Sequence, residues 1–240
     1  VARTTPTQMS KRKREVLTSF GGLYDCLPPP DPDKDAAAKA AAESKNKKPK
    51  LPTEDRTKVI FLDIDGVLIP AGSMETIWID GIMLPVRPTI KEGDFNVAAL
   101  TNLRSIVQRT GACIIISSEW RRSETLSSSI GTVLRSHDIP MFRDSTPILT
   151  PSPELHKLDP AVIWCERRAR EITTWLKDHK EVTSWVAIDD LDFSWADAVK
   201  AASTASIKYR SVLTNAHRCI TEENAEQAVQ LLLDPPREER

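Results

Sequence analysis

The sequence predicts an α/β fold in which helices cover both faces of a mostly parallel sheet. Three apolar runs, at residues 59–62, 113–116 and 185–188, have the uniform apolar character of strands that are buried on both faces. Apolar residues recur at helical spacing in the segments between these runs, so strands and helices alternate along the chain. Each run ends in Asp or Ser. Polar side chains therefore stand at the carboxyl ends of the predicted strands, where ligands bind in such sheets.

The chain begins with a tail that lacks the apolar residues needed for a core. Lys and Arg outnumber Asp and Glu by eleven to six over residues 1–50, against 22 to 28 in the rest of the chain. We expect this basic tail, rich in Pro, Ala and Lys, to span residues 1–55 and to be disordered or bound to a partner. One globular domain is expected at residues 56–234, followed by a short C-terminal tail at 235–240.

Two basic clusters in the tail, Lys11–Arg14 and Lys45–Lys50, are similar to nuclear-import signals or weak nucleic-acid contacts. A flexible, solubilising leader has the same composition. The clusters favour the nucleus, whereas an organelle is the expected location if Val1 marks a processed N-terminus. No apolar run approaches the roughly 20 residues that span a membrane, so we expect an intracellular protein without membrane insertion. Partners through the tail would be nucleic acid or a protein complex.

The first predicted strand leads into Asp63-Ile64-Asp65-Gly66, the most informative part of the chain. Residues i and i+2 of a strand project from the same face, so Asp63 and Asp65 converge, and Gly66 allows a sharp turn. Two carboxylates this close repel one another unless a cation or a shared proton intervenes, and hard oxygen ligands favour Mg2+. The alternative is an ordinary strand that ends in an acidic turn.

The next elements fit the same alternation. Residues 85–88, Pro-Val-Arg-Pro, indicate a loop or a short hairpin, and residues 95–109 are expected to form a helix. The second strand ends in Ser117-Ser118, and residues 123–137 are expected to form another helix.

The last part of the chain contains the third strand. A helix is expected around Arg167–Leu176, where apolar residues recur at intervals of three and four. The third strand then leads into Asp189-Asp190. A helix around 194–202 and a late strand at 207–213 follow, and Thr221 is expected to cap a final helix that ends near Leu233.

These strand ends supply four motifs in a familiar order: Asp63-Ile64-Asp65-Gly66-Val67, Ser117, Arg168 and Asp189-Asp190. In this order they resemble the haloacid dehalogenase-like (HAD) superfamily of phosphohydrolases, over residues 57–234. More narrowly, the chain looks like the HAD domain of predicted Swiss Army knife RNA-repair proteins. The segments that carry this closer resemblance are 117–121, 146–147, 168–176 and 185–190.

The resemblance implies a HAD-like Rossmannoid fold of three layers. It also bears on substrate class, because many members carry a cap domain between the first and second motifs or between the second and third. Each of these gaps is only about 50 residues here, so we expect no sizeable cap and an open site. By analogy, an open site suits a phosphorylated macromolecule, either a phosphoprotein or a nucleic-acid end.

The resemblance also implies chemical roles. Asp63 would attack phosphorus to form an aspartyl-phosphate, and Asp65 would protonate the leaving oxygen and then activate water. Ser117 would donate a hydrogen bond to a phosphoryl oxygen, and Arg168 would balance the charge.

The metal ligands are implied in the same way. Mg2+ would be held by Asp63, by the main-chain carbonyl of Asp65, and by either Asp189 or Asp190. The sequence does not choose between the last two.

The chain departs from the superfamily at the third motif, where Lys is usual. Arg168 has the same charge but a planar fork in place of an ammonium group. Arg167 and Arg170 are alternatives for this role. Ser118 could likewise replace Ser117, because hydroxyl residues at strand ends often serve only as caps.

Two residues that follow the second motif are candidates for substrate binding. Trp120 could stack on a base or ring, and Arg121 could contact a second phosphate. The alternatives are a buried aromatic side chain and an ordinary charge at a helix start.

The sequence therefore predicts a Mg2+-dependent phosphatase without a cap. A protein phosphatase similar to those that act on the polymerase C-terminal tail fits the first motif as well. A non-catalytic HAD-like subunit, anchored by its tail in a larger complex, is the alternative from a different class.

Overall fold

The computed structural model describes residues 52–79, 82–151, 157, 159–194 and 207–236. The predictions for the basic tail concern residues almost all of which lie outside this part of the chain. The same holds for the helix predicted around 194–202.

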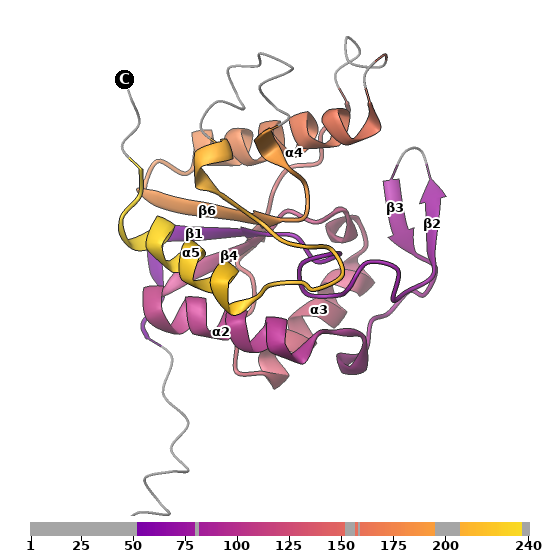
Figure 1. The fold of residues 1–240 in the computed structure, drawn as a ribbon, viewed down its shortest axis with the longest axis horizontal. Helices are drawn as coiled ribbons and strands as arrows, with labels where there is room; N and C mark the ends of the chain where they lie inside the picture. Colours follow the sequence, from indigo (N-terminus) through magenta and orange to yellow (C-terminus); the bar gives the residue numbers. More distant parts are fainter. Residues whose placement is uncertain (1–51, 80–81, 152–156, 158, 195–206, 237–240) are drawn as a thin grey trace, which may run out of the picture. The chain divides into compact units, whose positions relative to one another are not determined.

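Five parallel strands form the sheet at the centre of the fold (Figure 1). Their order across the sheet is β5, β4, β1, β6, β7. The strands are β1 (Asp55–Leu62), β4 (Ala112–Ile116), β5 (Asp144–Ser145), β6 (Ser184–Asp189) and β7 (Ser211–Leu213). The first motif thus follows the central strand, with the second and fourth motifs following its two neighbours.

Four α-helices and three short 3-10 helices accompany these strands in the described part of the chain. The α-helices are α2 (Val97–Thr110), α3 (Glu124–Ser136), α4 (Pro160–Asp178) and α5 (Glu222–Leu233). The 3-10 helices are η1 (Glu92–Asp94), η2 (Glu119–Arg122) and η5 (Ile207–Arg210). None of these helices is long and apolar enough to cross a membrane.

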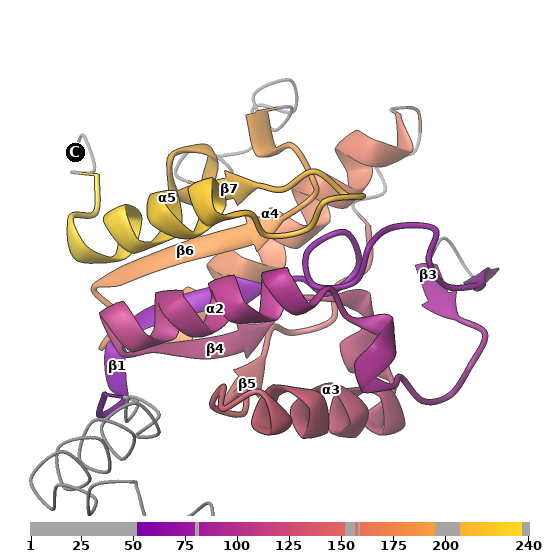
Figure 2. The ribbon, with the colours of Figure 1, turned by 60° about the horizontal axis from the view of Figure 1, so that its bottom comes forward.

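The two faces of the sheet bury different side chains because successive residues of a strand point in opposite directions. Ile60 pairs in register with Ile114 and Val186, and all three pack with α2, α3 and α5. The next residue, Phe61, pairs with Ala187 and packs with α4 on the other face. Figure 2 shows α2 and α5 together on one side of the sheet and α4 behind it. The predicted three-layer α/β fold is confirmed.

Local signals fix several helix ends. The side chain of Asn96 accepts hydrogen bonds from the backbone N–H groups of Ala98 and Ala99 at the start of α2, and Gly111 ends this helix with a φ of 70°. At the start of α5, Thr221 and Asn224 form a reciprocal capping box, so the cap predicted for the final helix is present.

A hairpin lies between the first and second motifs. It consists of β2 (Thr76–Ile79) and β3 (Ile82–Pro85), which pair antiparallel in a two-stranded sheet of their own. In Figure 1 the hairpin stands apart from the main sheet, and β3 contacts η2. This hairpin is far smaller than a cap domain, as the short gap between the motifs predicts.

One predicted strand is shorter than expected. Ile207–Arg210 forms the 3-10 helix η5, and only Ser211–Leu213 pairs with β6. Ile207 and Arg210 are both buried. A turn of three residues puts these two side chains on the same side, which a strand would not do.

Candidate active site

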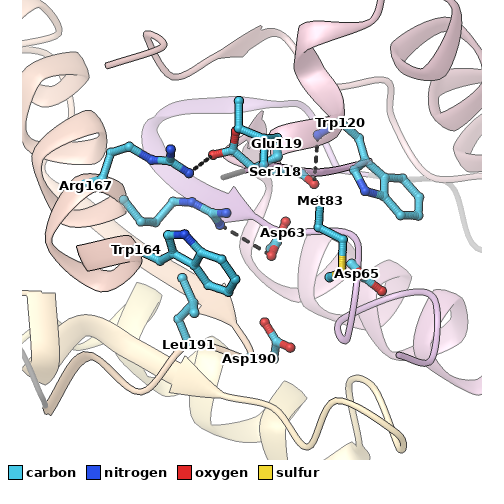
Figure 3. A pocket seen from close by; sticks show the side chains of 12 residues that line it. Asp63, Asp65, Met83, Ser118, Glu119, Trp120, Trp164, Arg167, Asp190 and Leu191 are labelled. Atoms are coloured by element: carbon cyan, nitrogen blue, oxygen red, sulfur yellow. Dashed lines mark hydrogen bonds and ion pairs between the residues drawn. The ribbon is translucent and has the colours of Figure 1, made fainter. Parts of the chain in front are cut away.

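The carboxyl edge of the sheet carries a small pocket with a volume of about 120 Å³. Its walls come from the ends of β1, β4 and β6, from the first half of α4, and from the hairpin. The lining residues are Asp63, Asp65, Ile82, Met83, Ser118, Glu119, Trp120, Trp164, Arg167, Arg168, Asp190 and Leu191. Figure 3 shows the side chains of Asp63 and Asp190 facing the same space, with Trp164 and Leu191 along one side.

Three carboxylates converge at this edge. One oxygen atom from each of Asp63, Asp189 and Asp190 lies within 4.8 Å of the others. Asp65 lines the same pocket. Oxygen donors with this much negative charge are the ligands that Mg2+ prefers, so the residues present fit a divalent cation.

The structure distinguishes the two aspartates of the fourth motif. Asp189 is 1% exposed, and its carboxylate oxygens are taken by Arg168, at 2.5 Å from Nη1, and by the backbone N–H of Leu191, at 3.0 Å. Asp190 is only half-buried and lines the pocket. Asp190 is therefore the aspartate whose carboxylate is open to a ligand, whereas Asp189 holds Arg168.

Gly66 is required for this arrangement in two ways. Its φ of 72° lies in the left-handed region, where a side chain is disfavoured. A Cβ atom at this position would also lie only 2.7 Å from Cγ of Asp190. The side chain of Asp190 thus packs directly against the backbone turn that follows Asp65.

Two of the carboxyls that line the pocket, those of Asp65 and Asp190, have raised pKa values. Burial, helped by the charge of Asp63, raises the pKa of Asp65 from 3.8 to about 6. Burial and the charges of Asp63 and Asp65 raise the pKa of Asp190 to about 7, against an opposing effect of Arg168. A cation in the pocket would relieve this repulsion.

Arg168 contacts the first motif directly. Its Nη1 lies 3.4 Å from an oxygen of Asp63, and both side chains are almost fully buried. Burial lowers the pKa of Arg168, but Asp189 and Asp63 outweigh this effect and raise it overall. Of the alternatives, Arg167 pairs with Glu119 at 2.6 Å, on the wall of the pocket.

The other alternative, Arg170, lies away from the pocket. Its guanidinium donates to Glu166, one turn earlier in α4, and to the backbone carbonyl of Thr150. Among the three arginines considered for the third motif, Arg168 is therefore the one that contacts Asp63.

The two serines of the second motif differ in position. Ser118 lines the pocket, and its Oγ accepts a hydrogen bond from the backbone N–H of Trp120 at 3.4 Å. Ser117 is equally buried but does not line the pocket. Its hydroxyl has no hydrogen-bond partner among the described residues. Ser118, the alternative that the sequence left open, is the serine that lines the pocket.

Trp120 does not have the exposure that its predicted role requires. It reaches the pocket wall but is only 2% exposed, and it packs in the core with residues of α2 and α3. This leaves no ring face for a base, so the structure does not support stacking by Trp120.

The guanidinium of Arg121 makes its ion pair and hydrogen bonds to groups inside the protein. Its side chain is 2% exposed and pairs with the buried Glu171 at 2.6 Å. The remaining N–H groups donate to the backbone carbonyls of Ser117, Ser118, Thr146 and Pro147. Arg121 therefore holds the loops after β4 and β5 together, in contrast to the predicted contact with a second phosphate.

Two pocket features were missed from the sequence. Trp164, which is half-buried, lines the pocket and stacks on Trp78 of the hairpin, with ring centroids 5.1 Å apart and planes 23° apart. Met83 of the hairpin lines the pocket as well. The short apolar run around Trp78, between turn residues, is the signal that could have indicated an exposed hairpin.

The match to a known family covers this whole site. The family described as "HAD domain in Swiss Army Knife RNA repair proteins" matches residues 59–225. No match was found among curated proteins or among solved structures. The matched segment is well over half of the 240 residues and includes every pocket residue described above. The chain therefore belongs to the family of HAD domains in Swiss Army Knife RNA repair proteins.

Proposed function

We propose that this chain is a Mg2+-dependent phosphatase that forms an aspartyl-phosphate on Asp63. The observation that carries the proposal is the contact of Asp63 with Arg168, at 3.4 Å, in a pocket that also contains Asp65 and Ser118. A nucleophile, a fixed cation, a general acid and a hydroxyl donor thus share one small space. The match to a family of HAD domains supports phosphatase chemistry in general terms, in agreement with this arrangement.

The first step transfers the phosphoryl group to the enzyme. A carboxylate oxygen of Asp63 forms a bond to phosphorus, and the ester bond to the leaving oxygen breaks. Asp65 gives its proton to that leaving oxygen. The raised pKa of Asp65, about 6, supports this role because it keeps a larger fraction of the carboxyl protonated near neutral pH than an ordinary aspartate would.

The second step releases phosphate. Asp65, now ionised, takes a proton from water, and the resulting hydroxide attacks phosphorus. The bond between phosphorus and Asp63 breaks, which regenerates the free carboxylate. Arg168 and Ser118 would stabilise the phosphoryl oxygens, Arg168 by charge and Ser118 by a hydrogen bond.

Mg2+ would be held by Asp63, Asp190 and the main-chain carbonyl of Asp65. When bound, it would neutralise the negative charge of a phosphate that approaches several carboxylates. Asp189 would act through Arg168, whose guanidinium it orients at 2.5 Å.

The substrate that we propose is a phosphorylated nucleic-acid end. The description of the family names RNA repair proteins, and the pocket volume of about 120 Å³ suits a phosphoryl group on a larger molecule better than a whole metabolite. A phosphoprotein is the competing macromolecular substrate.

The test is hydrolysis of an aryl phosphate by the purified chain, with and without Mg2+. Asp63→Asn removes the nucleophile at nearly constant volume and should abolish turnover. Asp178→Asn, the same change at an exposed residue of α4, is the matched control and should keep full activity. Acid quenching with a labelled phosphate ester should leave hydroxylamine-sensitive label on the wild-type protein and none on Asp63→Asn.

Two results would contradict the proposal. Activity retained by Asp63→Asn would exclude this nucleophile. If the folded wild-type protein hydrolyses no aryl phosphate, phosphorylated oligonucleotide or phosphopeptide, the chain is instead a non-catalytic HAD-like subunit.

A further inference from the structure

An exposed tryptophan stands beside two residues that line the pocket. Trp78 of β2 is 56% exposed, although one side of its ring is stacked on Trp164. Across the hairpin Trp78 pairs with Met83, and directly opposed residues of an antiparallel pair project from the same face. Met83 and Trp164 both line the pocket. Trp78 is thus one residue removed from the pocket, and its remaining surface is open to solvent.

The pocket is too small for a complete nucleotide. Pockets that enclose small-molecule ligands usually measure about 300–1,000 Å³, whereas this one measures about 120 Å³. A phosphoryl group bound against Asp63 and Arg168 would fill most of it. The group attached to that phosphate must then extend beyond the pocket, and one wall of the pocket is Trp164, on which Trp78 stacks.

A flat aromatic surface in this position suits a flat aromatic ligand. A Trp side chain whose only role was to hold the hairpin against α4 would stabilise the fold most if it were fully buried, because its large apolar surface is stabilising only when removed from water. Trp164 instead supports Trp78 from one side and leaves the rest of it accessible. Stacking on such a platform accepts any base, since every base has a π face.

We propose that Trp78, supported by Trp164, stacks on the base of the terminal nucleotide whose phosphate is bound in the pocket. This inference rests on the proposed phosphatase function and makes its substrate class specific. The base would be recognised without sequence preference. The phosphorylated side chains of Ser and Thr carry no ring to stack on Trp78 and would gain little from the platform.

The experiment compares matched substrates. Oligonucleotides with a 5′- or a 3′-terminal phosphate are prepared with a normal terminal base or with an abasic terminal nucleotide, and β-glycerol phosphate serves as a small ester without a ring. Trp78→Ala should lower kcat/KM for the end that carries a base by about 5- to 140-fold. Its activity on the abasic end and on β-glycerol phosphate should stay close to that of the wild type.

Two further variants separate stacking from folding. Trp78→Phe keeps an aromatic face and should recover most of the activity on the normal end. Tyr209→Ala removes another exposed aromatic side chain, from η5 outside the pocket, and should leave all substrates unaffected. Binding of the normal phosphorylated oligonucleotide to the inactive Asp63→Asn protein can be monitored by quenching of tryptophan fluorescence. The dissociation constant should rise by the same factor when Trp78→Ala is added.

The inference is overturned if Trp78→Ala loses activity equally on normal and abasic ends, or if it loses none. It is also overturned if the wild-type protein hydrolyses phosphopeptides but not phosphorylated oligonucleotides, a result that leaves the phosphatase itself intact. Absence of hydrolysis with every phosphate ester contradicts the proposed function instead.

Discussion

The carboxylates of Asp65 and Asp190 should make the metal-free protein less stable as the pH rises. The pKa of Asp65 is raised to about 6 and that of Asp190 to about 7, in both cases mainly by burial. Well below pH 3.8, the ordinary pKa of Asp, both carboxyls are protonated in the folded and in the unfolded chain. Between this pH and about 7 the folded protein holds more protons than the unfolded one, so the free energy of unfolding falls as the pH rises.

The size of this effect follows from the shifts. One pKa unit corresponds to about 1.4 kcal/mol, so the shift of Asp65 amounts to roughly 3 kcal/mol and that of Asp190 to roughly 4 kcal/mol. The two contributions to the free energy of unfolding are not fully additive, because the charge of Asp63 raises both pKa values and that of Asp65 also raises the pKa of Asp190. We expect a loss of roughly 3 kcal/mol between pH 5 and pH 7.5, which lowers Tm by roughly 6–12 °C for a domain of this size.

The assay is thermal unfolding in EDTA at a series of pH values. Asp190→Asn should show a clearly smaller decrease of Tm, whereas the exposed control Asp178→Asn should follow the wild type. Added Mg2+ should restore Tm at pH 7.5, since a ligand that binds only the folded state stabilises it. At pH 5 it should do little, because protons already occupy the carboxyls. Asp55, whose pKa is lowered to about 2 by Lys58 and Thr57, acts in the opposite direction only below about pH 4.

Two results would refute this reasoning. The first is a Tm in EDTA that is constant or rises from pH 5 to pH 7.5. The second is an Asp190→Asn variant with the same pH dependence as the wild type, since the repulsion would then arise elsewhere.

Three other substitutions test the site. Gly66→Ala should cost roughly 1–2 kcal/mol in a urea titration for the left-handed backbone alone, and should weaken Mg2+ binding by calorimetry because the new Cβ displaces Asp190. Arg168→Met should lower the free energy of unfolding by roughly 3–5 kcal/mol, since Asp189 is left buried without its partner; a change below 1 kcal/mol would contradict this. Arg121→Lys keeps the charge but loses the fork that holds four backbone carbonyls, so we expect a loss of roughly 2–3 kcal/mol by denaturant unfolding, with Arg122→Lys as the milder control.

The fold could be predicted from the sequence because it depends on patterns that are local. Uniform apolar runs gave the three central strands, and the alternation of strand and helix gave the layers. The order of strands also brings the polar residues after β1, β4 and β6 to one edge, so Asp63, Asp65 and the fourth motif were expected together. The strand predicted at 207–213 was partly wrong because its apolar residues fit a 3-10 turn as well as a strand.

The details of the site depend on contacts that no local pattern contains. Nothing in the Asp189-Asp190 pair says which carboxylate turns toward Arg168 and which toward the pocket; packing against Gly66 and α4 decides this. Arg121 lies beside the second motif in the sequence, as a substrate ligand would, but Glu171 draws its guanidinium into the interior.

The contact between Trp78 and Trp164 could not be predicted from the sequence. Trp78 and Trp164 belong to a hairpin and to a helix that are far apart in the chain, and only the folded protein brings their rings into contact. By contrast, Trp120 lies next to the second motif in the sequence and yet is buried. Proximity in the sequence to the second motif is thus a poor guide to which aromatic side chain is accessible near the pocket.

The hairpin has a consequence for how such a protein can diverge. Because β2 and β3 form a two-stranded sheet of their own, changes in their length or composition leave the hydrogen bonds of the central sheet unaltered. The residues proposed to carry out bond cleavage directly follow strands of that central sheet or belong to α4, whereas Trp78 and Met83 belong to the hairpin. Selection could therefore exchange the preferred substrate by remodelling about ten residues, without rebuilding the reaction centre or the hydrophobic core.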